Sequence, residues 1–256
     1  MKALFFDIDG TLVSFKTHKI PQTAIDALLE AKKNGIKIFI STGRSILQVD
    51  ELANIPFDGY ITQNGAFCCT ADKKIIFRKA FPRYINVAMA NYIEKRESFP
   101  CLFMSEERVI LNYVDQTVEL LSKLTGITFV DIMPLKEMVQ RDVLQYCAFV
   151  DEKLEKKLME EVFSDCIATR WNPYFVDINQ AGLDKGTGID RVLEYYNIPL
   201  SESMAFGDGG NDISMISHAA VGVAMGNAKN NVKEAADYIT DTVDNDGIAK
   251  ALKMFL

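Results

Sequence analysis

The stretch LFFDIDGTL, Leu4 to Leu12, constrains the fold more than any other part of this chain. An apolar run at residues 3–6 ends at Asp7, and a second acid, Asp9, follows two places later. Because the run shows almost no alternation, it predicts a strand buried on both faces of a parallel sheet. Ligands of such sheets bind beyond the carboxyl ends of the strands. Side chains two residues apart in an extended chain point the same way, so both carboxylates are expected at that end.

Two carboxylates that lie close together repel each other unless one is protonated or a cation lies between them. The spacing of Asp7 and Asp9 therefore leaves two interpretations open. The pair is either a solvated corner between strand and loop, or a site for a hard cation, most simply Mg²⁺. In the second case one acid is a nucleophile and the other carries a proton. The rest of the chain has to decide between them.

Composition narrows the class of protein and of partner. Of the 256 residues, 48% are hydrophobic and 25% are charged, as in globular proteins with a real core. The net charge of −7 argues against binding to a nucleic-acid backbone. The five cysteines are an odd number without a CxxC pair, which indicates reduced thiols. With no apolar run near the ~18 residues of a membrane span and no signal-peptide pattern, we expect a cytoplasmic protein without a membrane partner.

Strands and helices alternate at both ends of the chain. The pattern predicts a helix over residues 23–34 between the first strand and a second strand at 36–40. Such a strand–helix–strand crossover is right-handed by strong preference, and it places Thr42, which follows the second strand, near Asp7. Further predicted strands are 59–62, 203–206 and 220–224, and further predicted helices are 45–53, 185–196, the segment ending near 217, 228–236 and 246–255.

The middle of the chain does not alternate in this way. A hairpin is predicted at residues 66–78, and helices and strands then come in pairs between residues 81 and 184. The helices are expected at 82–96, 116–124 and 152–163, and the strands at 101–104, 108–113, 143–150, 167–170 and 174–178. We therefore predict a Rossmann-like, doubly wound and mostly parallel α/β core, residues 1–80 and 185–256, with an inserted α+β domain, residues 81–184.

Several polar residues follow strand ends or open helices, and each has a structural explanation of its own. Thr42 resembles a helix cap, and Lys185 resembles a solvated lysine. Asp208 and Asp212 resemble turn formers around glycines. Arg44 is interpreted as a surface cation or a structural hydrogen-bond donor, and Asn64-Gly65 is interpreted as a turn. Taken together, two acids, a hydroxyl, a lysine and a third acid predict one site for an anion and a metal ion.

These residues also carry a family resemblance. The sequence resembles the haloacid dehalogenase superfamily of phosphohydrolases, and within it the Cof-type branch, subclass IIB, with a large C2-type cap inserted in the core. The four signatures are Asp7-Ile8-Asp9-Gly10-Thr11-Leu12, Thr42-Gly43-Arg44, Lys185-Gly186 and Gly207-Asp208-Gly209-Gly210-Asn211-Asp212. The resemblance also covers 64–66, 222–228 and 246–247, and it is weakest in the middle of the chain.

The resemblance implies a role for each matching residue. Asp7 is expected to be the nucleophile that forms an aspartyl-phosphate, and Asp9 the general acid and then the general base. The implied cofactor is Mg²⁺, held by the Asp7 carboxylate, the Asp9 backbone carbonyl and Asp208. Asp212 is expected to orient metal-bound water or Lys185.

The phosphoryl oxygens need donors of their own. By the same resemblance they are held by Thr42, the Gly43 N–H, Lys185 and Asn211. Ser41 is an alternative source of the hydroxyl, although Thr42 fits the Thr-Gly-Arg signature better.

The implied function is a Mg²⁺-dependent phosphohydrolase of small phosphorylated metabolites, with sugar phosphates favoured by family analogy. Two alternatives stay open: a phosphotransferase or phosphomutase on the same site, and a non-enzymatic phospho-receiver module. Asp9 distinguishes a receiver module from an enzyme, because a positioned second acid hastens loss of the phosphoryl group. The expected partner is a small phosphorylated metabolite, without nucleic acid or membrane, and the expected state is a monomer or weak homo-oligomer.

Overall fold

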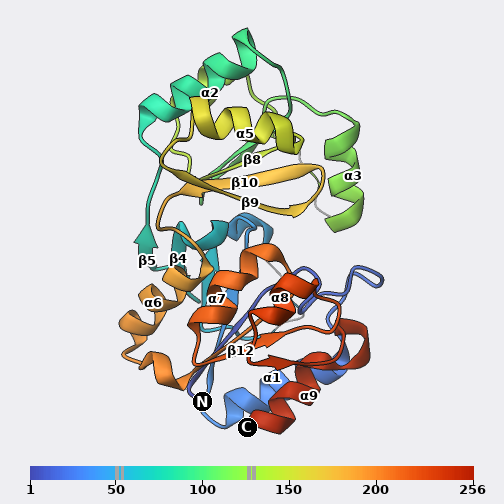
Figure 1. Ribbon diagram of the computed structural model, residues 1–256. Coiled ribbons are helices and arrows are strands. Elements are labelled where there is room, and N and C mark those ends of the chain that lie inside the picture. The colour runs from blue at the N-terminus through green and yellow to red at the C-terminus, as the bar shows by residue number, and fades with distance from the viewer. Residues whose placement is uncertain (50–51, 53–54, 126–127, 129–130) are drawn as a thin grey trace.

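The computed structural model of the chain describes residues 1–49, 52, 55–125, 128 and 131–256. Within these residues the chain forms two sheets, each covered by helices, and one sheet with its helices lies above the other (Figure 1). We call the lower unit the core and the upper unit the cap. Both termini lie at the end of the core that is remote from the cap (Figure 1).

The core sheet has the order β13-β12-β11-β1-β2-β3-β4-β5 among the described residues. The opening apolar run is β1, at the centre, and it pairs in parallel with β11 and β2. The strands are β1 (Ala3–Phe6), β2 (Lys37–Ser41), β3 (Gly59–Thr62), β4 (Phe67–Thr70), β5 (Ile75–Arg78), β11 (Ser203–Gly207), β12 (Val221–Ala224) and β13 (Tyr238–Ile239). Only the hairpin strands β4 and β5 add antiparallel pairs to the described ladder, so the predicted doubly wound, mostly parallel sheet is confirmed.

Helices cover both faces of the core sheet, which explains why β1 lacks alternation. Leu4 and Phe6 pack with α1 and α9 on one face, and Phe5 packs with α6 and α7 on the other. The rings of Phe6 and Phe206 stack at a centroid distance of 4.6 Å between β1 and β11. The core helices are α1 (Gln22–Lys33), α6 (Lys185–Tyr196), α7 (Ile213–His218), α8 (Asn230–Glu234) and α9 (Gly247–Phe255).

The cap sheet has the order β7-β6-β8-β10-β9, and its described strand pairs are antiparallel, as is typical of an α+β unit. Helices α2 and α5 cover one face, whereas Leu102, Met104 and Phe175 lie on the opposite face. The cap strands are β6 (Cys101–Met104), β7 (Val109–Leu111), β8 (Gln145–Ala148), β9 (Cys166–Asn172) and β10 (Phe175–Gln180). The cap helices are α2 (Arg83–Lys95), α3 (Gln116–Thr125), α4 (Leu135–Met138) and α5 (Glu152–Glu161).

The structure differs from the sequence-based prediction in a few short elements. The helix expected at 45–53 is a single 3₁₀ turn, η1 (Ile46–Gln48), closed by a capping box between Ser45 and Gln48; residues 50, 51 and 53 lie outside the described residues. Strand β13 and helix α4 were not predicted, because two and four residues carry too little periodicity. The chain passes from the core to the cap in the segment that joins β5 to α2, and it returns in the segment that joins β10 to α6. The exact domain bounds, 80/81 and 184/185, stay a prediction.

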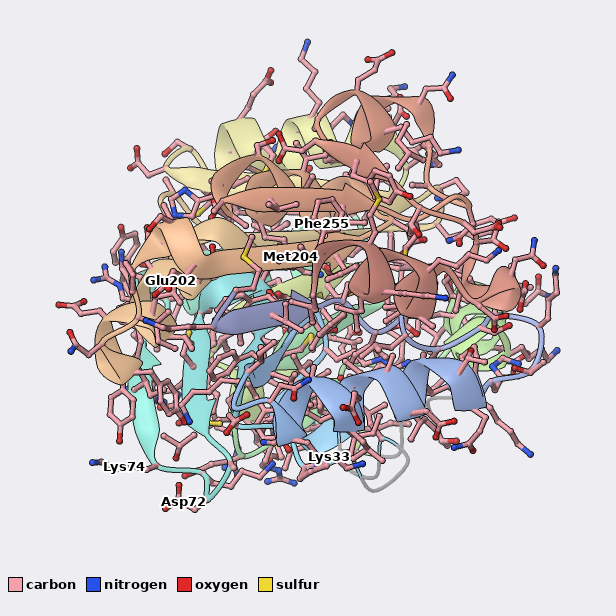
Figure 2. The ribbon with its side chains drawn as sticks, turned by 90° about the horizontal axis from the view of Figure 1, so that it is seen from below. Lys33, Asp72, Lys74, Glu202, Met204 and Phe255 are labelled. Atoms are coloured by element: carbon pink, nitrogen blue, oxygen red, sulfur yellow. The ribbon has the colours of Figure 1, made fainter. Side chains whose placement is uncertain are left out.

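Charged side chains surround the end of the core that faces away from the cap. Asp72 and Lys74 extend into solvent from the turn between β4 and β5, whereas Met204 on β11 is fully buried (Figure 2). Among the described helices, none has the length and apolar character needed to cross a membrane.

Helix α1 offers a matched pair for testing which face packs on the sheet. Leu28 is fully buried and its neighbour Leu29 is 36% exposed. Leu28→Ala should lower the free energy of unfolding by about 2–5 kcal/mol, because it leaves a cavity between α1 and the sheet. Leu29→Ala should change it by less than about 0.5 kcal/mol. Urea unfolding followed by circular dichroism measures both, and equal losses would show that α1 packs differently.

Candidate active site

The parallel pairing of β1 with β2 and β11 brings three strand ends to one edge of the core sheet. Asp7, Thr42 and Asp208 follow these strands, and all three line one cavity of about 340 Å³ between core and cap. Asp9, Gly43 and Asn211, which the resemblance assigns to the same site, also line this cavity. Side chains from the cap face, among them Leu102, Met104, Gln145, Phe175 and Asp177, form its roof.

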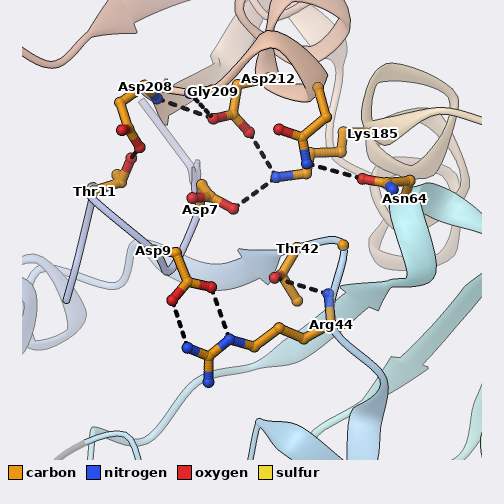
Figure 3. Close-up of polar contacts among 12 residues, drawn as sticks. Asp7, Asp9, Thr11, Thr42, Arg44, Asn64, Lys185, Asp208, Gly209 and Asp212 are labelled. Atoms are coloured by element: carbon orange, nitrogen blue, oxygen red, sulfur yellow. Dashed lines mark hydrogen bonds and ion pairs between the residues drawn. The ribbon is translucent and has the colours of Figure 1, made fainter. Parts of the chain in front are cut away.

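Lys185 lies fully buried behind Asp7. Its Nζ donates to Asp7 Oδ1 and to Asp212 Oδ1, each at 2.6 Å (Figure 3). A buried ammonium requires such partners, because its desolvation costs several kcal/mol. Lys185 is the first residue of α6, whose N-cap Asp184 accepts from the Thr187 N–H at 2.8 Å. The interpretation of Lys185 as a solvated lysine is therefore wrong.

Asp212 joins Lys185 to the loop after β11. Its Oδ1 accepts from Lys185, and its Oδ2 accepts from the backbone N–H groups of Asp208 at 2.9 Å and Gly209 at 2.8 Å. A Cβ on Gly207 would lie 2.4 Å from the Asp212 Cβ, so this close approach requires glycine. With both oxygens bonded in this way, Asp212 is placed to orient Lys185, one of the two roles expected for it.

Asp208 is held by two neutral donors that the sequence analysis did not assign. The Thr11 hydroxyl donates to Oδ1 at 2.9 Å, and the Asn227 amide donates to Oδ2 at 3.2 Å. The same amide donates to the Gly10 carbonyl at 2.8 Å, which links the loops after β1 and β12. Asn227 follows the end of a predicted strand, which marks it as a candidate for the site but does not identify Asp208 as its partner.

Asp9 turns its carboxylate toward Arg44. The guanidinium donates from Nε to Oδ2 at 2.7 Å and from Nη2 to Oδ1 at 2.5 Å (Figure 3). Such a bidentate pair fixes the orientation of both groups. The Arg44 side chain is only 16% exposed, so its interpretation as a surface cation is wrong.

The Thr42 hydroxyl accepts from the Arg44 N–H at 3.1 Å. The cap of the following 3₁₀ turn is Ser45 instead, whose Oγ accepts from the Leu47 N–H. Thr42 is therefore not the helix cap that its sequence context resembles. Among the described residues that line the cavity, Thr42 is present and the alternative hydroxyl, Ser41, is not.

The charges around Asp7 do not balance. Burial, followed by the negative charge of Asp212, raises the pKa of Asp7 well above its usual range, although Lys185 opposes this. Burial and then Asp212 also raise the pKa of Asp208, to about 7. Burial by itself lowers the pKa of Lys185, but Asp212 and Asp7 more than offset this and keep the lysine charged.

Such an excess of negative charge suits a divalent cation. One carboxylate oxygen from each of Asp7, Asp208 and Asp212 lies within 4.8 Å of the other two. Carboxylate oxygens are the ligands that Mg²⁺ prefers, so the donor set fits this ion. The Asp9 carboxylate does not belong to this group among the described residues, and the expected contribution of its backbone carbonyl stays a prediction.

A sequence model of the haloacid dehalogenase-like hydrolases matches residues 4–252. The chain belongs to this hydrolase family. The resemblance inferred from the four signatures, including the Cof-type branch, is thereby confirmed.

Several relatives of this haloacid dehalogenase-like hydrolase are phosphatases by name. YkrA of Bacillus subtilis, named as a phosphatase, is 30% identical over 255 residues, which cover 98% of this chain and 96% of YkrA. The 5-amino-6-(5-phospho-D-ribitylamino)uracil phosphatase YcsE of the same bacterium is 29% identical over 258 residues, 99% of this chain and 95% of YcsE. The solved structure of the HAD subclass IIB sugar phosphatase BT4131 is 42% identical in sequence, with a TM-score of 0.93. The match covers 100% of this chain and 99% of the BT4131 chain. The hydrolase is therefore a phosphatase, and the receiver-module alternative is wrong.

The raised pKa of Asp208 gives the metal-free phosphatase a characteristic pH dependence. Since its folded pKa is about 7 against an ordinary 3.8, this group's contribution to stability is complete below 3.8 and is lost as pH rises through 7. In EDTA the melting temperature should therefore fall across this interval, and it should fall less in Asp208→Asn.

Calorimetry with and without MgCl₂ tests the origin of this dependence. Below pH 7 protons compete with a cation for the carboxylates, so MgCl₂ should raise the melting temperature more above pH 7 than below it. A MgCl₂ effect of the same size in Asp208→Asn would contradict a metal site that includes this carboxylate.

Proposed function

We propose that this phosphatase hydrolyses small phosphorylated metabolites, sugar phosphates in particular, with Mg²⁺ as cofactor and through an aspartyl-phosphate on Asp7. The observation that carries this proposal is the Asp7 carboxylate in the wall of the cavity, bonded at Oδ1 to buried Lys185. The lysine orients this carboxylate and stabilises its ionised form, which is the nucleophilic one.

The first step transfers the phosphoryl group to Asp7, and the leaving alcohol takes a proton. Asp9 is the proposed donor, because it lines the same cavity from two residues further along the chain. Both of its oxygens accept a hydrogen bond from Arg44, and each keeps a second lone pair for the proton that passes to the leaving oxygen. In the second step Asp9 takes a proton from the water that attacks the aspartyl-phosphate, which restores Asp7 and releases phosphate.

The transferred group needs donors around its three outer oxygens. The Thr42 hydroxyl, the Gly43 N–H, the Lys185 ammonium and the Asn211 amide are proposed for this task. Thr42, Gly43 and Asn211 line the cavity, and Lys185 lies directly behind Asp7. Bound Mg²⁺, held by Asp7, the Asp9 carbonyl and Asp208, would neutralise charge on the same oxygens.

The proposed substrate class rests on size and on similarity. A cavity of about 340 Å³ suits a small metabolite and not a macromolecule. BT4131, at 42% identity, is named as a sugar phosphatase. The cap supplies the roof of the cavity, so we propose that residues 81–184 select the leaving group.

Asp7→Asn should abolish hydrolysis of p-nitrophenyl phosphate in the presence of MgCl₂, because an amide cannot form the phosphoenzyme. Release of p-nitrophenol measures this, and EDTA should abolish the wild-type signal as well. Wild-type turnover in Asp7→Asn would remove Asp7 as the nucleophile, and EDTA-insensitive turnover would remove the metal.

Asp9→Asn should reduce kcat by at least about 10²-fold, the usual contribution of general acid–base catalysis. The variant should still become phosphorylated by an activated ester, because Asp7 and Lys185 are intact. Rapid-quench measurement of the phosphoenzyme separates the two steps, and an unchanged kcat would exclude Asp9 as proton carrier.

The phosphotransferase alternative differs only in the acceptor. Acceptor sugars added during turnover should leave inorganic phosphate as the main product if hydrolysis is the reaction. A phosphorylated acceptor as main product would instead favour transfer.

A further inference from the structure

The turn η2 (Gln63–Gly65), which follows β3, has an uncommon backbone. Its three residues have positive φ angles of 52°, 50° and 91°. Positive φ is rare outside glycine, and such conformations persist where the surrounding structure holds them, often at functional sites. At Gly65 a Cβ would lie 2.1 Å from the Asp184 carbonyl oxygen, so only glycine fits. The interpretation of Asn64-Gly65 as a simple turn does not explain why buried residues adopt this conformation.

The turn contacts every segment that carries a proposed phosphate donor. The Asn64 N–H donates to the Thr42 carbonyl at 3.1 Å, and Asn64 Oδ1 accepts from Asn211 Nδ2 at 3.1 Å. Gly65 packs against Asp184, the residue before Lys185. Figure 3 shows Asn64 on the same side of the site as Lys185 and Thr42. The turn is therefore placed to set the positions of all three segments, through Asn64 for two of them and through Gly65 for the third.

The same side chain reaches the cap. Asn64 Nδ2 donates to Gln145 Oε1 on β8 at 3.0 Å and to Asp177 Oδ2 on β10 at 3.3 Å. Gln145 Nε2 in turn donates to the Gly43 carbonyl at 2.9 Å. Three hydrogen bonds thus connect Asn211, Asn64, Gln145 and Gly43 in one chain that passes from core to cap and back.

Because the amides in this series are buried, breaking their hydrogen bonds is costly. Asn64 is 4% exposed and Gln145 is 1% exposed, so bonds lost on separation of cap and core leave buried polar groups without partners. Gly43 lacks a side chain to restrain its backbone, so the bond from Gln145 to its carbonyl limits the range of its dihedral angles. Docking of the cap therefore aligns two of the groups proposed to hold the phosphate.

We propose that Asn64 and Gln145 are positioning residues that couple cap docking to alignment of the Gly43 and Asn211 phosphate donors. This inference rests on the proposed function for the role of those donors. Coupling of this kind is reciprocal, so a phosphate-like ligand on the core stabilises the docked cap by the amount that docking improves its binding.

Two variants interrupt this series of hydrogen bonds at different points. Asn64→Gly removes the amide and keeps a backbone that adopts positive φ without strain. Gln145→Glu keeps an oxygen for Asn64 and places a carboxylate oxygen against the Gly43 carbonyl. Asn179→Ala is the control, because this cap amide bonds to the Gln63 carbonyl at 3.0 Å and contacts neither phosphate donor.

Kinetics with p-nitrophenyl phosphate give the first readout. Each of the two variants should lower kcat/KM by about 10-fold, the equivalent of one buried hydrogen bond. The double variant should lose little more than either single one, because both interrupt one path. Asn179→Ala should stay within about 3-fold of wild type. Additive losses in the double variant, or an equal loss in Asn179→Ala, would overturn the coupling.

Hydrogen exchange gives a readout that does not depend on turnover. In the wild type, MgCl₂ with orthovanadate should slow amide exchange in β8, residues 145–148, although the ligand sits on the core. This protection should be lost in Asn64→Gly and kept in Asn179→Ala. Protection that is absent in the wild type, or unchanged in Asn64→Gly, would overturn the inference. A wild type that shows protection but hydrolyses no phosphate ester would instead overturn the proposed function and leave the coupling intact.

Discussion

The buried ammonium of Lys185 is the interaction on which the rest of the site depends. It bonds at 2.6 Å to carboxylates from two other segments, Asp7 after β1 and Asp212 after β11. Because an unpaired buried charge is so costly, these three segments can pack only in the arrangement that brings the charges together. The ion pairs therefore hold Asp7, the proposed nucleophile, in place and tie the start of α6 to the centre of the sheet.

The remaining acids occupy different environments, which is how similar side chains take different roles. Asp9 is paired with Arg44, outside the cluster formed by the other three carboxylates. Burial, followed by the negative charge of Asp212, raises the pKa of Asp208 to about 7, although the hydrogen bond from the Thr11 hydroxyl opposes this. A cation beside Asp7 and Asp208 would relieve this repulsion, while Asp9, the proposed proton carrier, lies apart from them beside Arg44.

Local pattern was sufficient for elements whose signal is contained in their own residues. The apolar run at β1, the helical spacing of α1 and the helix that opens at Lys185 were predicted within a residue or two. The residues that bond to Asp9 and Asp208 were not predicted. An arginine near a glycine, or an asparagine after a strand, has the same sequence context whether its side chain is buried or solvated. Arg44 and Asn227 acquire their roles only from residues 35 and 19 positions away.

The sequence by itself determined which strand ends carry chemistry, because acids and hydroxyls that interrupt buried apolar runs leave a local pattern. It also determined the family, since three of the four signatures lie at those ends and the fourth, Lys185-Gly186, opens α6. Only the tertiary structure decided that Lys185 is buried, that Asp9 faces Arg44, and that Asn64 joins the cap to the core. Hydrogen bonds between distant segments depend on where the folded chain places each donor and acceptor, and no periodicity along the chain records that.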